Sequence, residues 1–209
     1  MTSLENALAE LPLFAILRGL VPEEADAVGD ALFEAGIRAV EVPLNSPRPL
    51  DSIARLAARF EGRMVVGAGT VLTTEEARAV AAAGGRFAVA PNTDADVIAA
   101  ALAAGIVPVP GVATATEALV AIKAGAVHLK LFPAGTYGPG HVKALLPVLP
   151  AAVRIYAVGG VGPAAMGEWA AAGAAGAGLG GELFKPGMSA ADVGARARTA
   201  AGAARAAWR

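Results

Sequence analysis

The sequence predicts an α/β fold, a single-domain (β/α)₈ TIM barrel over residues 1–209, and three observations lead to this prediction. Eight short apolar runs of β type recur along the chain, and helical segments separate them. Successive runs begin roughly 20 to 27 residues apart, the length of one strand-plus-helix unit. Strict alternation is typical of a parallel sheet. Eight units favour closure into a barrel, whereas an open doubly wound sheet, the alternative, usually has fewer strands.

The elements follow one another without a linker or a low-complexity stretch. The expected strands are residues 13–19, 39–44, 64–70, 87–92, 106–111, 128–133, 154–160 and 175–181. Helix-start signals precede many of the segments between them, at residues 22–24, 73–76, 93–94, 114–117 and 163. Glycine closes several of these segments, at residues 36, 84, 85, 105, 125 and 173. Residues from about 187 to 207 are expected to form the closing helix.

Composition narrows the class of protein. The chain is 56% hydrophobic and 17% charged, so it can bury a large core, and its net charge of −1 gives no reason to expect nucleic acid or a membrane surface as partner. Absence of cysteine excludes disulfides, thiolate nucleophiles and zinc–thiolate sites, and fits the reducing cytoplasm that we expect as its location. The polar N-terminus does not resemble a secretory signal, and no apolar run has the length of a membrane span.

Lys130 lies inside the apolar run "HLKLFP", whereas the other three lysines lie in helical or loop contexts. Alternation along a strand would turn Leu129 and Leu131 toward the helices, and His128, Lys130 and Phe132 toward the barrel axis. A lysine there could simply snorkel to the rim or pair with a carboxylate. Alternatively, burial lowers the pKa of an amine, because the ammonium form loses its solvation, and makes it a nucleophile toward carbonyls.

Glu41 is the one acidic residue within a strand core, in "AVEVPL". By the same alternation it points into the barrel, toward the mouth that Lys130 faces. A buried ion pair that merely fixes the core is the bland interpretation, and such a pair is weak evidence for stability. A carboxyl beside a reactive amine could instead move protons during imine formation and carbon–carbon cleavage. The two residues together indicate Schiff-base chemistry.

Two further residues at strand ends are candidates for substrate binding. Arg18 ends the first strand, and its planar fork suits a carboxylate, although a surface salt bridge is as common a role. Thr70 closes "GAGT" after the third strand and offers a hydroxyl at the rim. The plainer interpretation of Thr70 is a helix cap after a tight turn.

Glycine pairs end the last two strands, in "AVGGVGP" and "AGLGGELF". Such pairs let backbone N–H groups converge on an anion, and barrel enzymes often hold a phosphate after strands seven and eight. Gly159, Gly160, Gly180 and Gly181 are therefore the expected phosphate seat. No Walker motif is present, and "GAGT" lacks the dinucleotide fingerprint, so the phosphate is expected to belong to a small substrate. His128 and His141 lack carboxylate partners at ligand spacing, so we expect no metal site.

The motifs "AILRG", "VEVPLNSP", "VGAGTVL", "PGVATATEA", "LKLFPA", "AVGGV" and "GAGLGGELF" follow one another in the order of the KDPG/KHG aldolases, and the resemblance covers nearly the whole chain. These are class I aldolases that cut 2-keto-3-deoxy-6-phospho sugar acids into pyruvate and glyceraldehyde 3-phosphate. Within the family the chain is most similar to the galactonate-type members, which serve galactose breakdown. Pro43 and Asn45 carry this similarity, since gluconate-type members usually have threonine and arginine there.

The resemblance implies roles for the same residues. Lys130 would form the Schiff base, and Glu41 would be the general acid and base, through a water. Arg18 and Thr70 would hold the pyruvate carboxylate. It also implies that Phe132 and Pro91 pack against the imine. A homotrimer without metal or organic cofactor is typical of the family.

The sequence departs from the family pattern at one position, and three alternative functions stay open. Relatives often have serine where this chain has Gly181, so the phosphate would rely on backbone N–H groups, with Thr136 or a water. The gluconate epimer, or both epimers, could be the substrate. The second alternative function is a barrel that binds sugar phosphates without catalysis. The third is an isomerase or epimerase that uses Glu41 without an imine.

Overall fold

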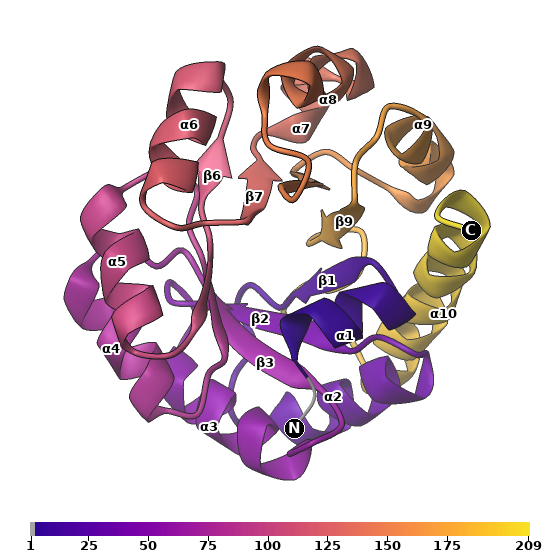
Figure 1. Cartoon of the computed structure of the whole chain (residues 1–209). Coiled ribbons are helices and arrows are strands. Elements are labelled where there is room, and N and C mark those ends of the chain that lie inside the picture. The colour runs from indigo at the N-terminus through magenta and orange to yellow at the C-terminus, as the bar shows by residue number, and fades with distance from the viewer. Residues whose placement is uncertain (1–2) are drawn as a thin grey trace.

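The computed structural model describes residues 3–209, in which parallel strands form a closed cylinder surrounded by helices (Figure 1). The order of the strands in the sheet is β5-β4-β3-β2-β1-β9-β8-β7-β6. Their bounds are β1 (Leu13–Ile16), β2 (Ala39–Pro43), β3 (Val65–Gly69), β4 (Phe87–Val89), β5 (Val107–Val109), β6 (Gly111–Val112), β7 (His128–Leu131), β8 (Arg154–Val158) and β9 (Gly176–Leu179). All strand pairs are parallel, as the β-α alternation predicts.

The sheet closes through its fifth strand, which is split at Pro110 into β5 and β6. Proline has no N–H to give to a strand ladder, which explains the break. Its carbonyl still accepts a hydrogen bond of 2.8 Å from the N–H of Lys130. Since β5 pairs with β4 and β6 with β7, this strand joins the two ends of the sheet. The predicted barrel of eight strand units is confirmed, with one unit in two pieces.

Helices form the outer ring (Figure 1). They are α2 (Ala25–Glu34), α3 (Pro49–Arg59), α4 (Thr74–Ala82), α5 (Ala95–Ala103), α6 (Ala115–Lys123), α7 (Ala134–Tyr137), α8 (Pro139–Leu145), α9 (Met166–Ala171) and α10 (Ala190–Ala207). The start signals before α4, α5 and α6 are confirmed, because Thr73, Asp94 and Thr114 cap these helices. The signal at residues 22–24 is early. These residues form a turn, and Glu24 makes no side-chain cap, so α2 begins only at Ala25.

A helix that the sequence pattern did not predict closes the base of the barrel. This helix, α1 (Leu4–Glu10), buries Leu4 and Leu8 against a cluster inside the cylinder. Phe14 is the centre of that cluster, with ring centroids 5.5 Å from Phe87 and 5.1 Å from Tyr156. The interior is therefore filled with aromatic side chains at the base, while polar groups lie nearer the opposite end, where the strands finish.

Side-chain alternation along the strands agrees with the predicted orientations. Leu129 and Leu131 belong to the apolar layer between the strands and the helices, together with Val40 and Val42. The residues between them, including Lys130, point into the barrel. His128 also points inward, but at the base, where its Nδ1 lies 3.1 Å from the Tyr156 hydroxyl. His128 is thus a satisfied interior residue on the side of the barrel away from the strand ends.

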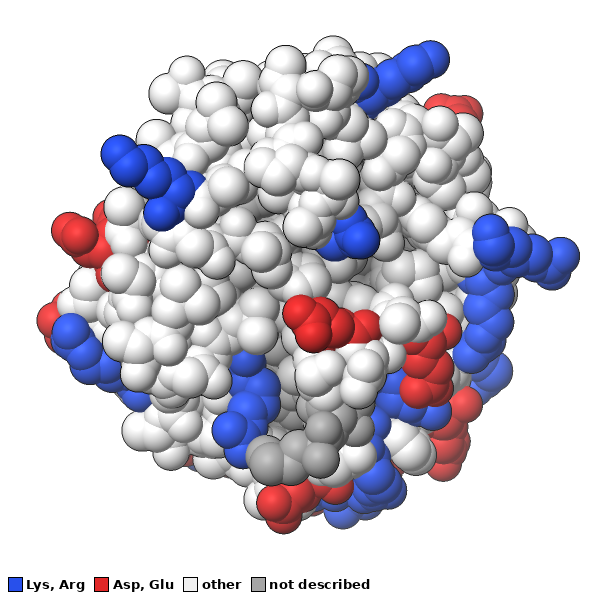
Figure 2. All heavy atoms as spheres, viewed as in Figure 1, with Lys and Arg blue, Asp and Glu red and all other residues white. Residues whose placement is uncertain are grey.

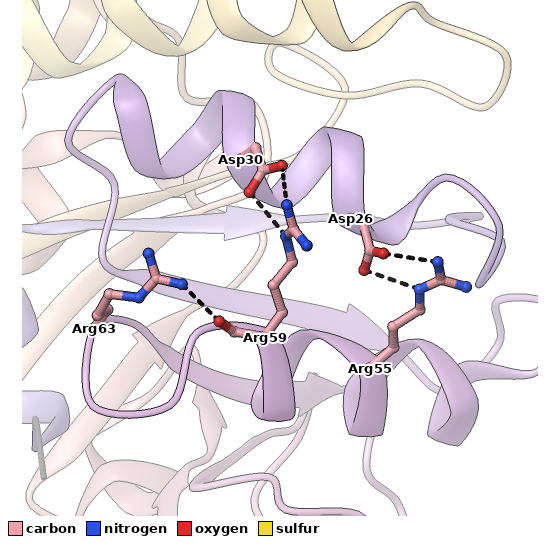
Figure 3. Close-up of polar contacts among 5 residues, drawn as sticks. All are labelled: Asp26, Asp30, Arg55, Arg59 and Arg63. Atoms are coloured by element: carbon pink, nitrogen blue, oxygen red, sulfur yellow. Dashed lines mark hydrogen bonds and ion pairs between the residues drawn. The ribbon is translucent and has the colours of Figure 1, made fainter.

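Paired charges connect α2 to α3 on the surface (Figure 3). Arg55 donates to both carboxylate oxygens of Asp26, at 2.9 and 2.7 Å, and Arg59 binds Asp30 in the same two-pronged way. The Arg55 guanidinium lowers the pKa of Asp26. The side chains are partly exposed, and exposed pairs add little stability, so we regard them as fixing how the two helices align.

Charge is unevenly spread over the face seen in Figure 2. Lysine, arginine and acidic side chains are frequent over α2, α3 and α10, and sparse over α6, α7 and α8. Within residues 3–209, no helix has both the length and the apolar character needed to cross a membrane.

Candidate active site

A cavity of about 350 Å³ opens at the ends of the strands and collects most of the residues singled out from the sequence. It lies on the side of the barrel opposite α1, where the loops that follow parallel strands gather. Its walls are Ile16, Arg18, Glu41, Thr70, Lys130, Phe132, Val158, Gly159, Gly160, Val161, Gly178, Gly180, Gly181 and Glu182. Residues far apart in the sequence thus share one small chamber.

Lys130 is 6% exposed, and its Nζ lies 4.6 Å from the centroid of the Phe132 ring. Burial lowers the pKa of this amine, the Glu41 charge opposes that shift, and the Arg18 charge adds to it. Its Nζ forms no hydrogen bond or ion pair with any described side chain. Within the described chain it therefore neither snorkels into solvent nor forms half of an ion pair, so neither structural interpretation of Lys130 applies.

Glu41 is 2% exposed, and its Oε2 is buried without a hydrogen-bond partner among the described residues. Burial raises the pKa of this carboxyl, against the opposing charges of Lys130 and Arg18. Burial thus shifts the pKa of each group toward its uncharged form, downward for the Lys130 amine and upward for the Glu41 carboxyl. An amine attacking a carbonyl needs this combination, a nucleophile together with a proton donor.

Gly69 makes room for the Glu41 carboxyl. A Cβ atom at Gly69 would lie 2.3 Å from Glu41 Oε2, and real Cβ contacts are longer. We expect Gly69→Ala to displace the carboxyl and to lower kcat about 10- to 100-fold, a part of what acid–base catalysis typically contributes. Steady-state kinetics and a thermal melt would check this. The control is Gly167→Ala, since that site has no atom within 4 Å of the added methyl group; equal kcat in the two variants would contradict the role of Gly69.

Arg18 is exposed, lines the cavity and donates a hydrogen bond to the Asn45 side-chain oxygen. The neighbouring N–H of Gly19 donates to Ser46 Oγ at 2.9 Å, so two bonds join the loop after β1 to the loop after β2. The guanidinium is therefore aimed by an amide and not by a surface carboxylate. Sequence reasoning identified Arg18 but missed Asn45 and Ser46 as the residues that position it.

Removing that amide tests the positioning. We expect Asn45→Ala to raise KM for the substrate about fivefold, since a typical hydrogen bond contributes about 1 kcal/mol. The value of kcat should stay within about twofold, because the chemistry at Lys130 is untouched. Asn6→Ala, an exposed asparagine at the base, serves as control. An unchanged KM would show that Arg18 holds its position alone.

Thr70 occupies the left-handed region, with φ of 57°, and a β-branched residue rarely adopts that conformation. Residues in such strained conformations are held there by the surrounding structure, and they cluster at active sites and ligand-binding sites. The alternative role as a helix cap is wrong, because Thr73 caps α4. Thr70 instead lines the cavity.

The four glycines expected to bind the phosphate all lie in the cavity wall. Gly159 and Gly160 have φ of 89° and 76°, two successive left-handed residues that glycine adopts most readily. Gly180 and Gly181 line the same end but have no such requirement. A side chain at Gly181 would find open space, with Lys185 Cε the nearest atom, 3.8 Å from the added Cβ.

Two residues that were expected to contact the substrate do not line the cavity. Pro91 is not in its wall, because its carbonyl faces Gly111, where an added Cβ would lie only 2.2 Å away. Thr136 is also outside the wall. Conversely, Ile16, Val158 and Glu182 line the cavity and were not predicted, although their places at or just after strand ends were a usable signal.

A metal is not suggested by the side chains themselves. Within the described chain, no group of three or more histidine, aspartate or glutamate side chains is arranged to hold a metal ion.

A closed parallel barrel whose polar groups gather at the strand ends is typical of barrel enzymes. The chain belongs to the KDPG and KHG aldolase family, whose sequence profile matches residues 4–204. It is thus an aldolase, a lyase.

Individual relatives agree with this assignment. A protein of Rhizobium meliloti (strain 1021) named "Probable 2-dehydro-3-deoxy-6-phosphogalactonate aldolase" is 50% identical over 90% of this chain and 89% of its own. The "2-dehydro-3-deoxy-6-phosphogalactonate aldolase" of Escherichia coli (strain K12) is 47% identical over 86% of this chain and 88% of its own. The solved "Native KDPGal structure" superposes with a TM-score of 0.93 at 44% identity, over 95% of this chain and 96% of that one.

Proposed function

We propose that the chain cleaves 2-dehydro-3-deoxy-6-phospho-D-galactonate into pyruvate and D-glyceraldehyde 3-phosphate through a Schiff base on Lys130. The observation that carries this proposal is that a buried amine with lowered pKa and a buried carboxyl with raised pKa line one cavity. The names of the two relatives at 50% and 47% identity support the galactonate substrate.

The first step is binding of the substrate, which positions its C2 carbon for reaction. The substrate carboxylate meets Arg18, whose planar fork accommodates two oxygens, and the hydroxyl of Thr70. The phosphate lies at the opposite end, over Gly159, Gly160, Gly180 and Gly181. With both ends held, C2 is presented to Lys130, and proximity of this kind supplies a large share of catalysis.

The covalent chemistry begins at C2. The neutral Lys130 amine attacks C2 while Glu41 gives a proton to the ketone oxygen, and loss of water from the carbinolamine leaves an iminium ion. The carboxylate of Glu41, through a water, next takes the proton of the C4 hydroxyl. The C3–C4 bond breaks, its electrons enter the iminium to form an enamine, and C4 leaves as the aldehyde of glyceraldehyde 3-phosphate. Proton return to C3 and hydrolysis release pyruvate and the amine.

Trapping tests the covalent step. Borohydride with pyruvate is expected to leave a reduced pyruvyl adduct on Lys130, which peptide mass spectrometry locates. Lys123 is exposed and should carry none. A barrel that only binds sugar phosphates, or an isomerase without an imine, would give no adduct. An adduct on Lys123 instead of Lys130 would overturn the proposal.

The epimer is tested separately. We expect faster cleavage of the galactonate than of the gluconate epimer when both are supplied at equal concentration. Comparable rates would mean dual specificity, and a clear preference for the gluconate epimer would assign the chain to the other substrate.

Assembly as a homotrimer is part of the proposal. Large apolar side chains are exposed on and near α5 and α6: Leu102, Leu119, Val120 and Val127, each at least 43% exposed. Charged side chains are sparse over α6, α7 and α8 on the face seen in Figure 2. Apolar surface of this kind commonly marks a contact between subunits. Sedimentation equilibrium is expected to give three times the chain mass of 20.6 kDa, and a monomer would contradict this.

A further inference from the structure

The phosphate end of the cavity has no positive side chain in its wall. The cations that line the cavity are Lys130, in its interior, and Arg18, which is bound to Asn45. The charge at the phosphate end is negative: Glu182 Oε2 lies 4.0 Å from where a Cβ of Gly162 would be. A phosphate ester carries close to two negative charges at neutral pH. It would be opposed by this carboxylate unless a cation stands nearby.

The Lys185 side chain lies next to Gly181, at the edge of this end of the cavity. After β9 the chain curls, because the N–H groups of Leu183 and Phe184 both donate to the carbonyl of Gly180, at 2.8 and 2.9 Å. The curl brings the Lys185 side chain back over Gly181, with Cε 3.8 Å from the added Cβ position. The ammonium is one bond beyond that atom. Gly181 itself lines the cavity.

The Lys185 ammonium is free, and its backbone is anchored. The side chain is exposed and forms no ion pair with any described residue. Its N–H donates to Met188 Sδ at 3.2 Å, and the Met188 N–H returns a bond of 3.1 Å to the Lys185 carbonyl. The next residue, Pro186, packs so closely on Gly19 that an added Cβ there would lie 2.5 Å from its ring. The lysine stem is thus attached to a fixed turn at the cavity edge.

We propose that Lys185 is a specificity-determining residue that supplies the positive charge for the substrate phosphate. The carboxylate of Glu182, which also lines the cavity, opposes this binding. Lys185 thereby favours phosphorylated over unphosphorylated 2-keto-3-deoxy acids at an end of the cavity whose glycines offer no side-chain donor. This inference rests on the proposed function, since it requires a phosphorylated keto acid bound through Lys130.

Kinetics with matched substrates test the lysine. In the full-length enzyme, Lys185→Met is expected to raise KM for the phosphorylated acid about tenfold, as for loss of one charge-assisted contact. The same change should leave kcat, and the kcat/KM for the unphosphorylated acid, within about twofold. Lys185→Arg should restore KM to within about threefold of the wild type. Lys123→Met, which removes an exposed lysine from α6, is the matched control.

Glu182→Gln should act in the opposite direction. Removing the carboxylate is expected to lower KM for the phosphorylated acid about threefold, an effect that added salt reduces. A higher KM in this variant would contradict the placement of the phosphate near both charges.

The outcomes separate this inference from the proposed function. If wild-type enzyme forms no pyruvate adduct on Lys130, the proposed function fails. If it forms the adduct and cleaves the phosphorylated acid, but Lys185→Met behaves like Lys123→Met, only the role of Lys185 is overturned. Equal loss on both substrates in Lys185→Met would also overturn it, because a purely structural role does not distinguish them.

Discussion

Replacing Lys130 by methionine is expected to lower kcat for cleavage on the order of 10⁵-fold, the scale of loss when a covalent nucleophile is removed. Lys130→Arg should be as inactive, because a guanidinium stays protonated and cannot attack a ketone. The substrate should still bind, since Arg18 and the phosphate seat are untouched. Pyruvate release measures the rate, and calorimetry measures the affinity. Activity retained in Lys130→Arg would indicate chemistry without an imine.

The same methionine should stabilise the fold. Burial lowers the pKa of Lys130 from its ordinary value of 10.5, so the unfolded chain binds this proton more strongly than the folded chain. The resulting penalty is absent above pH 10.5 and grows as the pH falls toward the lowered pKa. The free energy of unfolding of Lys130→Met, measured in urea, should therefore exceed that of the wild type by more at pH 7 than at pH 10.5. A difference that shrinks on going to pH 7 would contradict the shift.

The second large effect is expected at Glu41. Glu41→Gln should lower kcat by about 10²- to 10⁴-fold, the usual contribution of a general acid and base, while KM changes little. The amide keeps the shape but can neither give nor take the proton. Glu168→Gln, on α9 and outside the cavity wall, is the control. If Glu41→Gln turns over as fast as this control, another group moves the protons.

The stability of Glu41→Gln should depend on pH in the opposite direction from that of Lys130→Met. Burial raises the pKa of Glu41 above its ordinary 4.5, so the folded chain holds the proton more tightly than the unfolded chain. The penalty is absent below pH 4.5 and grows as the pH rises through the raised value. Relative to the wild type, Glu41→Gln should thus gain stability between acid and neutral pH. Two active-site substitutions that abolish catalysis would then both stabilise the barrel at neutral pH, a common trade-off in enzymes.

The inward orientation of Lys130 and Glu41 was predictable because it depends on short-range rules. Alternation along a strand has a fixed period of two, so flanking leucines at 129 and 131 turn Lys130 inward whatever the rest of the chain does. The same holds for Glu41 between Val40 and Val42. Helix caps such as Thr73 were predictable for the same reason, since their hydrogen bonds span three residues.

Contacts between loops were not predictable, because sequence spacing says nothing about which loop ends meet. The hydrogen bond between Arg18 and Asn45 spans 27 positions, and nothing in the sequence around either residue indicates that the other is its partner. The family resemblance implied that Pro91 packs against the imine, but Pro91 is not in the cavity wall, and its carbonyl faces Gly111 instead. Glu182 and Lys185 follow a glycine pair that drew attention to backbone N–H groups, and only the curl after β9 shows where their charges lie.

By itself the sequence determined a chain of alternating strands and helices, a parallel barrel, and an amine and a carboxyl that face its interior. Tertiary structure alone decided that the base is sealed by α1, that the fifth strand breaks at Pro110, and how deeply Lys130 and Glu41 are buried. The physical reason is that local periodicity sets direction, whereas desolvation and pKa depend on every segment that packs around a group. The lowered pKa of Lys130 is a consequence of that packing.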